Sequence, residues 1–174
     1  MKLTPVMEKF IVHWGEMGTR WGVNRTVAQI HALLYLSPTP LNAEEISTTL
    51  GAARSNVSTS LKELMSWGLV KVSHVLGDRR DHFESMKDIW DIFNCVVEER
   101  KKREIDPTLT LLRQCELEAA DDTETPDEVK QRIKNMTEFL ETLTTWYGQM
   151  NGIPRSALVK LMKLGSTITR FLGK

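Results

Sequence analysis

Apolar side chains between residues 41 and 85 recur first at a helical period and then in a short run rich in β-branched residues. A first short helix is predicted from Asn42, which suits an N-cap, and Glu45 three residues later can complete a capping box. Leu50 closes the apolar face of this helix. Gly51 supplies the backbone freedom that a tight turn between two helices requires.

A second helix is predicted over residues 54–66, with Gly68 as a left-handed cap at its end. Val57, Leu61 and Leu64 fall at i, i+4 and i+7 and form a narrow apolar stripe. The other side is rich in hydroxyl groups, although Ser and Thr are poor helix formers in a helix interior. A helix kept only for stability would not need them. Its polar residues of interest are Arg54, Ser55, Asn56, Ser58, Thr59 and Lys62.

A β-hairpin is predicted after the second helix. Its first strand begins at Leu69 in a run of β-branched residues, and its second strand ends at Ser85. Residues 76–80 form the turn, with Arg79 and Arg80 at the tip. The loop is therefore a basic one.

Two helices joined by a tight turn and followed by a basic hairpin form the pattern of a winged helix-turn-helix, whose second helix lies in the major groove. Hydroxyl and amide groups there can meet base edges, and Arg54 can pair with guanine. Arg79 and Arg80 can enter a minor groove or bind phosphate, and Asp78 is predicted to orient an arginine by a salt bridge. We therefore expect these polar residues to bind double-stranded DNA. The alternative is an ordinary surface helix followed by a charged turn.

The chain resembles the MarR superfamily of winged-helix regulators, and more closely its GbsR-type branch. The resemblance extends from about Phe10 to Met150 and is carried by FIVHWGEMGTRWGVNRT, PLNAEEISTTLG, SNVSTSLKELMSWGLV, GDRRDHF, EERKKREIDPTL and TTWYGQM. It implies a homodimeric transcriptional regulator that recognises a DNA sequence. It also implies that an effector, where one exists, binds between the DNA-binding part and the dimerisation helices.

Further helices are predicted on both sides of this segment. A helix near the N-terminus contains Gly15 and Gly18, which permit a close approach of another helix. Another helix over residues 25–36 ends at the prolines of residues 37–40. The fold class is therefore mostly α with a small β-wing. Residues 1–87 are expected to form the winged helix-turn-helix domain with its N-terminal helix, and residues 88–174 a helical dimerisation region.

The dimerisation region is expected to contain three helical stretches. A long helix begins near Ile89 and restarts at Asp106, which is followed by a proline suited to the first helical position. After a linker at 119–125, Thr125 is predicted to cap the next helix. That helix has a heptad-like seam, which can pack inside one subunit or between two. The seam consists of Val129, Ile133, Met136, Leu140, Leu143, Tyr147 and Met150. A last amphipathic helix includes Leu158, Ile168 and Phe171.

The formal net charge of the chain is zero, which by itself disfavours nucleic-acid binding. The charge is unevenly distributed, however. Residues 1–87 hold 10 Lys and Arg against 8 Asp and Glu, a net of +2, while residues 88–128 hold 5 against 13, a net of −8. Residues 129–174 hold 8 against 2, a net of +6. Because the acidic block lies outside the predicted DNA-binding segment, we expect modest non-specific affinity that depends on salt.

Composition indicates an ordinary globular protein of the cytoplasm. No apolar run approaches the roughly 20 residues that a membrane span requires, and the first residues lack a signal-peptide core. Cys95 and Cys115 are expected to be reduced thiols. The four histidines show no metal-ligand spacing, and no catalytic motif is present, so neither a metal, a cofactor nor an enzyme activity is expected.

Large aromatic residues define a candidate effector pocket. The GbsR-type branch is similar to choline-responsive repressors, and a quaternary ammonium group requires aromatic faces. The candidates are Trp14, Trp21, Trp90, Phe93, Trp146 and Tyr147. The alternative is that these rings fill the core, which is the more common use of large aromatics. The sequence leaves open whether a small-molecule effector exists.

Two functions from different classes follow. One is a homodimeric repressor that blocks an operator by binding it. The other is a winged-helix module that binds another protein in a larger assembly.

Overall fold

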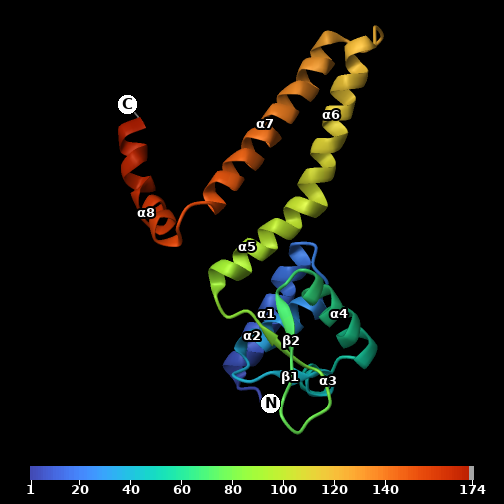
Figure 1. Cartoon of the computed structure of the whole chain (residues 1–174), viewed down its shortest axis with the longest axis vertical. Helices are drawn as coiled ribbons and strands as arrows, with labels where there is room; N and C mark the ends of the chain where they lie inside the picture. Colours follow the sequence, from blue (N-terminus) through green and yellow to red (C-terminus); the bar gives the residue numbers. More distant parts are fainter. Residues whose placement is uncertain (173–174) are drawn as a thin grey trace. The chain divides into compact units, whose positions relative to one another are not determined.

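The computed structural model describes residues 1–172 and divides the chain into two compact units (Figure 1). We call residues 1–100 the head and the chain from residue 101 onward the extension. The head contains α1 (Pro5–Arg20), α2 (Arg25–Leu36), β1 (Leu41–Asn42), α3 (Ala43–Leu50), α4 (Arg54–Ser66), β2 (Val70–Ser73), β3 (His82–Ser85) and α5 (Ile89–Arg100). The extension contains a π-helical turn (Lys101–Ile105), α6 (Asp106–Asp121), α7 (Asp127–Asn151) and α8 (Arg155–Leu172). The predicted fold class, mostly helical with a small β-wing, is confirmed.

The core of the head is built from the apolar stripes that the sequence pattern predicts. Val57, Leu61 and Leu64 of α4 are all at most 2% exposed. They pack in one cluster with Ile30 and Leu33 of α2. Burying each side chain of this size contributes roughly 1.5–3 kcal/mol relative to leaving it in water. The inner face of α4 is thereby fixed, and its polar face is turned outward.

The close packing of α1 against α2 depends on a glycine. A Cβ atom placed on Gly18 would lie 2.5 Å from the Cβ of Ala28, closer than two carbon atoms can approach. The predicted role of this glycine in close helix packing is therefore confirmed. Gly15 has a similar position, 2.7 Å from the Cγ of Gln29.

The turn between α3 and α4 also has the predicted chemistry. Asn42 accepts hydrogen bonds from the backbone N–H groups of Glu44 and Glu45, and the Glu45 carboxylate accepts one from the Asn42 N–H at 2.8 Å. This is the predicted capping box. Gly51 then adopts the left-handed conformation at φ 62°. Gly68 does the same after α4 at φ 76°.

The wing is a three-stranded antiparallel sheet in the order β1-β3-β2. Two of its strands correspond to the predicted hairpin, with Val72 opposite Phe83. The third, β1, was not predicted, because it consists of two residues and exists only through its pairing with β3. Leu41 lies opposite Phe83 in that pairing, which joins the wing to the start of α3.

The head extends further along the chain than the predicted boundary after residue 87. Helix α5 belongs to the head because Ile92 is only 5% exposed and lies in the head core. Cys95 and Val96 pack against the same cluster. The apolar pattern of α5 is therefore used to complete the head rather than to start a separate region.

In the extension, α6 and α7 pack against each other as a helical hairpin. Arg113 of α6 donates hydrogen bonds to the Glu141 carboxylate of α7 at 2.7 and 2.9 Å. The predicted linker is shorter than expected, since α6 continues to Asp121. The predicted cap at Thr125 is wrong, because its hydroxyl donates to the Asp122 carboxylate and Pro126 stands at the N-cap position.

The restart of the long helix near residue 106 takes the form of the π-helical turn Lys101–Ile105. Asp106 is not an N-cap as predicted but the first residue of α6, and its carboxylate accepts hydrogen bonds from Lys101 at 2.8 and 3.0 Å. The separate last helix is confirmed, since α7 ends at Asn151 and α8 begins at Arg155. The side chains of Ile168 and Phe171 lie outside the described residues.

Candidate nucleic-acid interface

The outer face of α4 presents the polar residues that the sequence singles out. Ser55, Ser58, Thr59 and Lys62 fall within an arc of about 100° on a helix of 3.6 residues per turn. Arg54 lies beside this arc near the N-terminal end. All six candidate residues of α4, Asn56 included, are exposed. The face therefore offers three hydroxyl groups and a lysine to the same side.

The N-terminus of α4 is also open to a ligand. Its N-cap residue is Ala53, whose side chain forms no capping hydrogen bond. The first N–H groups of a helix have no partner within the helix and carry partial positive charge, so they favour an anion such as phosphate. Arg54 is the first residue of this turn.

At the tip of the wing, Arg80 is held by an acidic neighbour. Its guanidinium group donates to both oxygens of Asp78, at 2.9 Å from Nε to Oδ1 and 2.5 Å from Nη2 to Oδ2. The hydrogen bonds from Arg80 lower the pKa of Asp78 far below its usual range, and the same pair raises the pKa of Arg80. The predicted salt bridge of Asp78 with a wing arginine is thus present.

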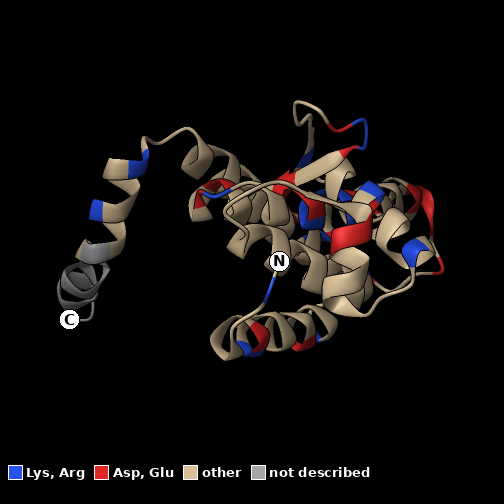
Figure 2. Ribbon diagram, turned by 90° about the horizontal axis from the view of Figure 1, so that it is seen from below, with Lys and Arg blue, Asp and Glu red and all other residues tan. Residues whose placement is uncertain are grey.

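Two further contacts hold Arg80 in place. The Glu44 carboxylate of α3 lies 3.5 Å from Nη1 of Arg80, which joins the wing to the first helix of the helix-turn-helix. His82 is buried at the start of β3, and its Nδ1 donates a hydrogen bond to the Arg80 carbonyl at 3.0 Å. Arg79 is exposed beside Arg80. Figure 2 shows basic and acidic segments interspersed along the ribbon.

The head also contains an apolar hollow of about 320 Å³. It is formed by α1, α2, the end of α4 with the start of β2, and α5. Three of the six candidate effector residues line it, namely Trp14, Trp21 and Phe93. Trp90 is half-buried on α5 and is not among the lining residues. Trp146 and Tyr147 belong to α7 in the extension.

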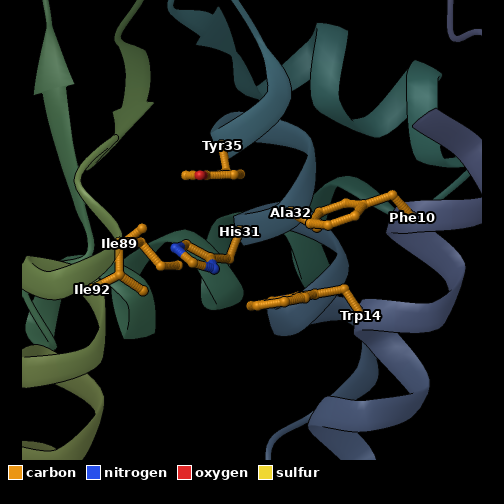
Figure 3. Close-up of a pocket in the computed structure, with 7 residues that line it drawn as sticks. All are labelled: Phe10, Trp14, His31, Ala32, Tyr35, Ile89 and Ile92. Carbon is orange, nitrogen blue, oxygen red and sulfur yellow. The ribbon is translucent and has the colours of Figure 1, made fainter. Parts of the chain in front are cut away.

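Two lining residues of the hollow were not singled out from the sequence. Arg100 places its guanidinium carbon 5.6 Å from the centre of the Trp21 ring and donates a hydrogen bond to the Trp21 carbonyl. His31 lies between Trp14 and the isoleucines of α5 (Figure 3). A signal for His31 existed, because it interrupts the apolar inner face of α2.

His31 is a polar residue among the apolar side chains that line the hollow. It is 5% exposed, and its Nε2 atom has no hydrogen-bond partner among the described residues. Burial, and to a lesser degree the charge of Lys87, lower the pKa of His31 to about 4. The ring is therefore neutral at physiological pH. His31 also lines a smaller hollow of about 10 Å³, together with Phe10 and Tyr35.

Among residues 1–172 the structure contains no group of three or more His, Cys, Asp or Glu side chains arranged to hold a metal ion. Within the same range no helix is both long and apolar enough to cross a membrane. Cys95 and Cys115 are free thiols.

Comparison with known proteins gives a match between part of the chain and one family model. Residues 21–81 match the sequence model of the MarR family, a segment that contains α2 to α4 and the wing up to the candidate arginines. No curated protein matches the chain in sequence.

Among solved structures, one described as a transcriptional regulator is similar with a TM-score of 0.62 at 20% identity, covering 91% of this chain and 99% of that chain. This likeness establishes the fold. The S. aureus MepR–DNA complex scores 0.38 at 17% identity, covering 79% of this chain and 92% of that chain. The Thermotoga maritima regulator Tm0710 scores 0.39 at 17% identity, with 80% and 92% covered.

Proposed function

We propose that the chain is a DNA-binding transcriptional regulator of the MarR superfamily, with a sequence close to the GbsR-type branch. The observation that carries the proposal is the outward face of α4, with its hydroxyl groups and an N-terminus that no side chain caps. A major groove accepts such a helix, and base edges pair with short hydroxyl and amide groups. The wing arginines belong to the same compact unit as the helix-turn-helix.

The two parts of the interface have different tasks. Phosphate contacts fix the position of a protein on DNA but carry no sequence information, whereas contacts with base edges do. We assign Arg79, Arg80 and Lys62 to the backbone or the minor groove. We assign Asn56 and Thr59 to base edges, with Arg54, Ser55 and Ser58 beside them. Asp78 orients Arg80 and does not itself face the duplex.

We further propose that the regulator is a homodimer and acts as a repressor. A dimer places two α4 helices on successive turns of DNA, about 34 Å apart. The net charge of +2 over residues 1–87 is small, and a dimer doubles it. A bound dimer can block transcription sterically without touching the polymerase. Because the target is DNA and the cysteines are free thiols, we place the protein in the cytoplasm.

The mutations that test this proposal separate affinity from specificity. Arg80→Ala should weaken binding to all duplexes by a similar factor and lower the slope of log affinity against log salt by about 1. Asn56→Ala and Thr59→Ala should instead change the preferred sequence, with a discrimination loss of about 1–3 kcal/mol for the contacted base. Binding selection from random duplexes followed by titration measures both. Equal losses on preferred and random DNA from the Thr59 variant would contradict its assignment.

The alternative function is a winged-helix module that binds protein. It shares the fold but needs no DNA contact. Footprinting on the DNA upstream of the chain's own coding region distinguishes the two. Protection there supports the regulator, and no protection of any duplex at low salt supports the protein-binding module.

We also propose that the hollow in the head binds a small effector. A volume of about 320 Å³ is at the lower end of ligand pockets, so it suits a compact molecule. The residues that line it include no acid and one cation, Arg100. A quaternary ammonium ion would therefore meet a like charge, and a neutral or anionic aromatic molecule fits better. Its polar group can hydrogen-bond the unpaired Nε2 of His31.

Tryptophan fluorescence tests the ligand class, because Trp14 and Trp21 line the hollow. Titration with benzoate should change the emission, and titration with choline should not. Trp14→Leu should weaken the benzoate response. A response to choline alone would show that the ligand class is wrong, and no response to either would remove the effector proposal.

A further inference from the structure

The tip of the wing carries a leucine that the fold leaves entirely in water. Leu76 is 103% exposed, the highest value among the exposed large apolar side chains that the structure describes. Val75 beside it is 40% exposed. Figure 1 and Figure 2 show the loop between β2 and β3 projecting away from the helices of the head. The side chain of Leu76 therefore contributes nothing to the core.

A tight turn holds Leu76 at this tip. The backbone N–H of Asp78 donates a hydrogen bond to the Val75 carbonyl at 3.1 Å, which closes a turn of four residues. Gly77 at the third position has φ 87°, as a type II turn requires. The turn depends on this glycine and not on an apolar neighbour. A polar residue in place of Leu76 would form the turn equally well, so the fold does not explain the leucine.

Ion pairs behind the turn connect it to the helix-turn-helix. Arg80 donates hydrogen bonds to both carboxylate oxygens of Asp78, which is itself the last residue of the turn. The Glu44 carboxylate of α3 lies 3.5 Å from the same guanidinium group. Arg79 is exposed next to this pair. Leu76 is thereby presented at a defined place on the head, close to two cations in the sequence.

These cations indicate which kind of partner receives the leucine. A single exposed leucine is ordinary on a protein surface and by itself needs no partner. Because Leu76 shares its loop with Arg79 and Arg80, a partner that covers the tip must offer an apolar slot beside negative charge. The minor groove of DNA offers both, since its phosphates flank base pairs whose faces can separate. Proteins of several folds insert leucine there as a wedge between base pairs.

We propose that Leu76 is a wedge that enters the minor groove and partly unstacks one base step beside the site read by α4. This inference rests on the proposed function and deepens it. Pyrimidine–purine steps, TA and CA, are the easiest to unstack or kink. The wing therefore prefers such a step at a position where no hydrogen bond reads the bases. Leu76 would determine specificity through the deformability of the duplex.

The energetic balance predicts a larger effect on specificity than on affinity. Unstacking a base step costs free energy, whereas burial of the leucine side chain returns free energy of similar size. The two contributions largely cancel on a flexible step. On a stiff step the cost is higher and the return is the same.

Permanganate oxidation tests the wedge directly, because it attacks thymines that have lost their stacking. The probe is the duplex recovered by the binding selection described above, incubated with the full chain at low salt. A thymine of a TA or CA/TG step beside the α4 site should become reactive when the unmodified chain binds. Leu76→Ala should abolish this reactivity and weaken binding by about 10-fold. Leu76→Met keeps a long apolar side chain and should retain the reactivity.

Two further measurements separate a wedge from a charge contact. Replacing the reactive step by AA, which is stiff, should weaken the unmodified chain by about 10-fold and the Leu76→Ala chain much less. Leu76→Ala should leave the slope of log affinity against log salt unchanged, because no cation is lost. Arg79→Ala should lower that slope by about 1.

Leu117→Ala is the matched control, since it is the same chemical change at a leucine that is 76% exposed on α6, outside the wing. It should leave thymine reactivity and affinity unchanged. Leu76→Ala removes no buried surface, so its urea unfolding should match that of the unmodified chain.

Three results would overturn the inference. No reactive thymine in the bound duplex would exclude a wedge. Reactivity that persists in the Leu76→Ala complex would place the deformation under another part of the head. A Leu76→Ala chain that binds as tightly as the Leu117→Ala chain would show that Leu76 does not contact the duplex.

Titration of the duplex separates this inference from the proposed function, because it measures binding independently of oxidation. A chain that binds the duplex without unstacking it removes the wedge and keeps the regulator. A chain that binds no duplex at low salt removes both.

Discussion

His31 lies in the core of the head beside aromatic and aliphatic side chains, with an unpaired ring nitrogen. Burial favours its neutral form and lowers its pKa from 6.5 to about 4. In the unfolded chain the ring takes up a proton below pH 6.5, whereas in the folded chain it does so only near pH 4. Protonation therefore favours unfolding across this interval.

We expect the free energy of unfolding to fall as the pH decreases from 6.5 to 4, by up to about 3 kcal/mol from His31 alone. The full contribution is present above pH 6.5, and no further loss from this group occurs below pH 4. His31→Phe keeps the ring and removes the titration. Urea unfolding of both chains at neutral pH and near pH 4 measures the loss of stability on acidification, which should be larger for the unmodified chain than for the His31→Phe chain. Parallel pH profiles of the two chains would contradict this account.

At the scale of the element, Lys87 closes the C-terminal end of α2 from a distant part of the chain. Its ammonium group donates to the carbonyls of Leu34, Tyr35 and Ser37 at 2.7, 2.8 and 2.8 Å. The last carbonyls of a helix have no partner within it and carry partial negative charge, which a lysine satisfies. Because Lys87 directly follows the wing, this contact also fixes where α5 begins.

Lys87→Met should destabilise the head by about 1–3 kcal/mol, because three carbonyl groups lose a charged donor. Lys71→Met is the matched control. Lys71 forms an exposed ion pair with Glu84 at 3.2 Å, and such pairs contribute about 0–1 kcal/mol. Urea unfolding at one pH compares the two variants. Equal effects would mean that the three carbonyl contacts do not stabilise the head.

Elements governed by local chemistry could be predicted, and those governed by distant contacts could not. The bounds of α4 follow from its apolar stripe and from Gly68, so they agree with the prediction. Strand β1 could not be predicted because its two residues are ordered by β3, about 40 positions away in the sequence. The cap at Thr125 was wrong because Asp122 competes for its hydroxyl group.

The same distinction holds for the candidate site. The exposure of the α4 residues follows from helical periodicity, so those residues could be chosen from sequence alone. The hollow combines α1, α2 and α5 with Trp67 at the end of α4, and no local pattern brings these together. His31 and Arg100 were missed for that reason. Trp146 and Tyr147 belong to α7 in the extension, so their place in an effector pocket stays a prediction.

At the scale of the whole molecule, the charge pattern and the packing place the boundary between the two parts of the chain at different residues. The head carries the candidate DNA-binding residues, while the strongly acidic segment from 88 to 128 includes α6 of the extension. A boundary placed after residue 87 by composition divides α5 from the core that it completes. The unit boundary at residue 100 follows packing instead, because Ile92 is buried in the head.

The pairing of Arg80 with Asp78 and Glu44 has a kinetic consequence. Carboxylates offset part of the positive charge at the wing tip, so a lone head should leave the duplex quickly. In the proposed homodimer, long occupancy would depend on two heads held together, since the second rebinds before the first escapes. Under this arrangement, a change that misaligns one copy by a few ångströms is enough to release both.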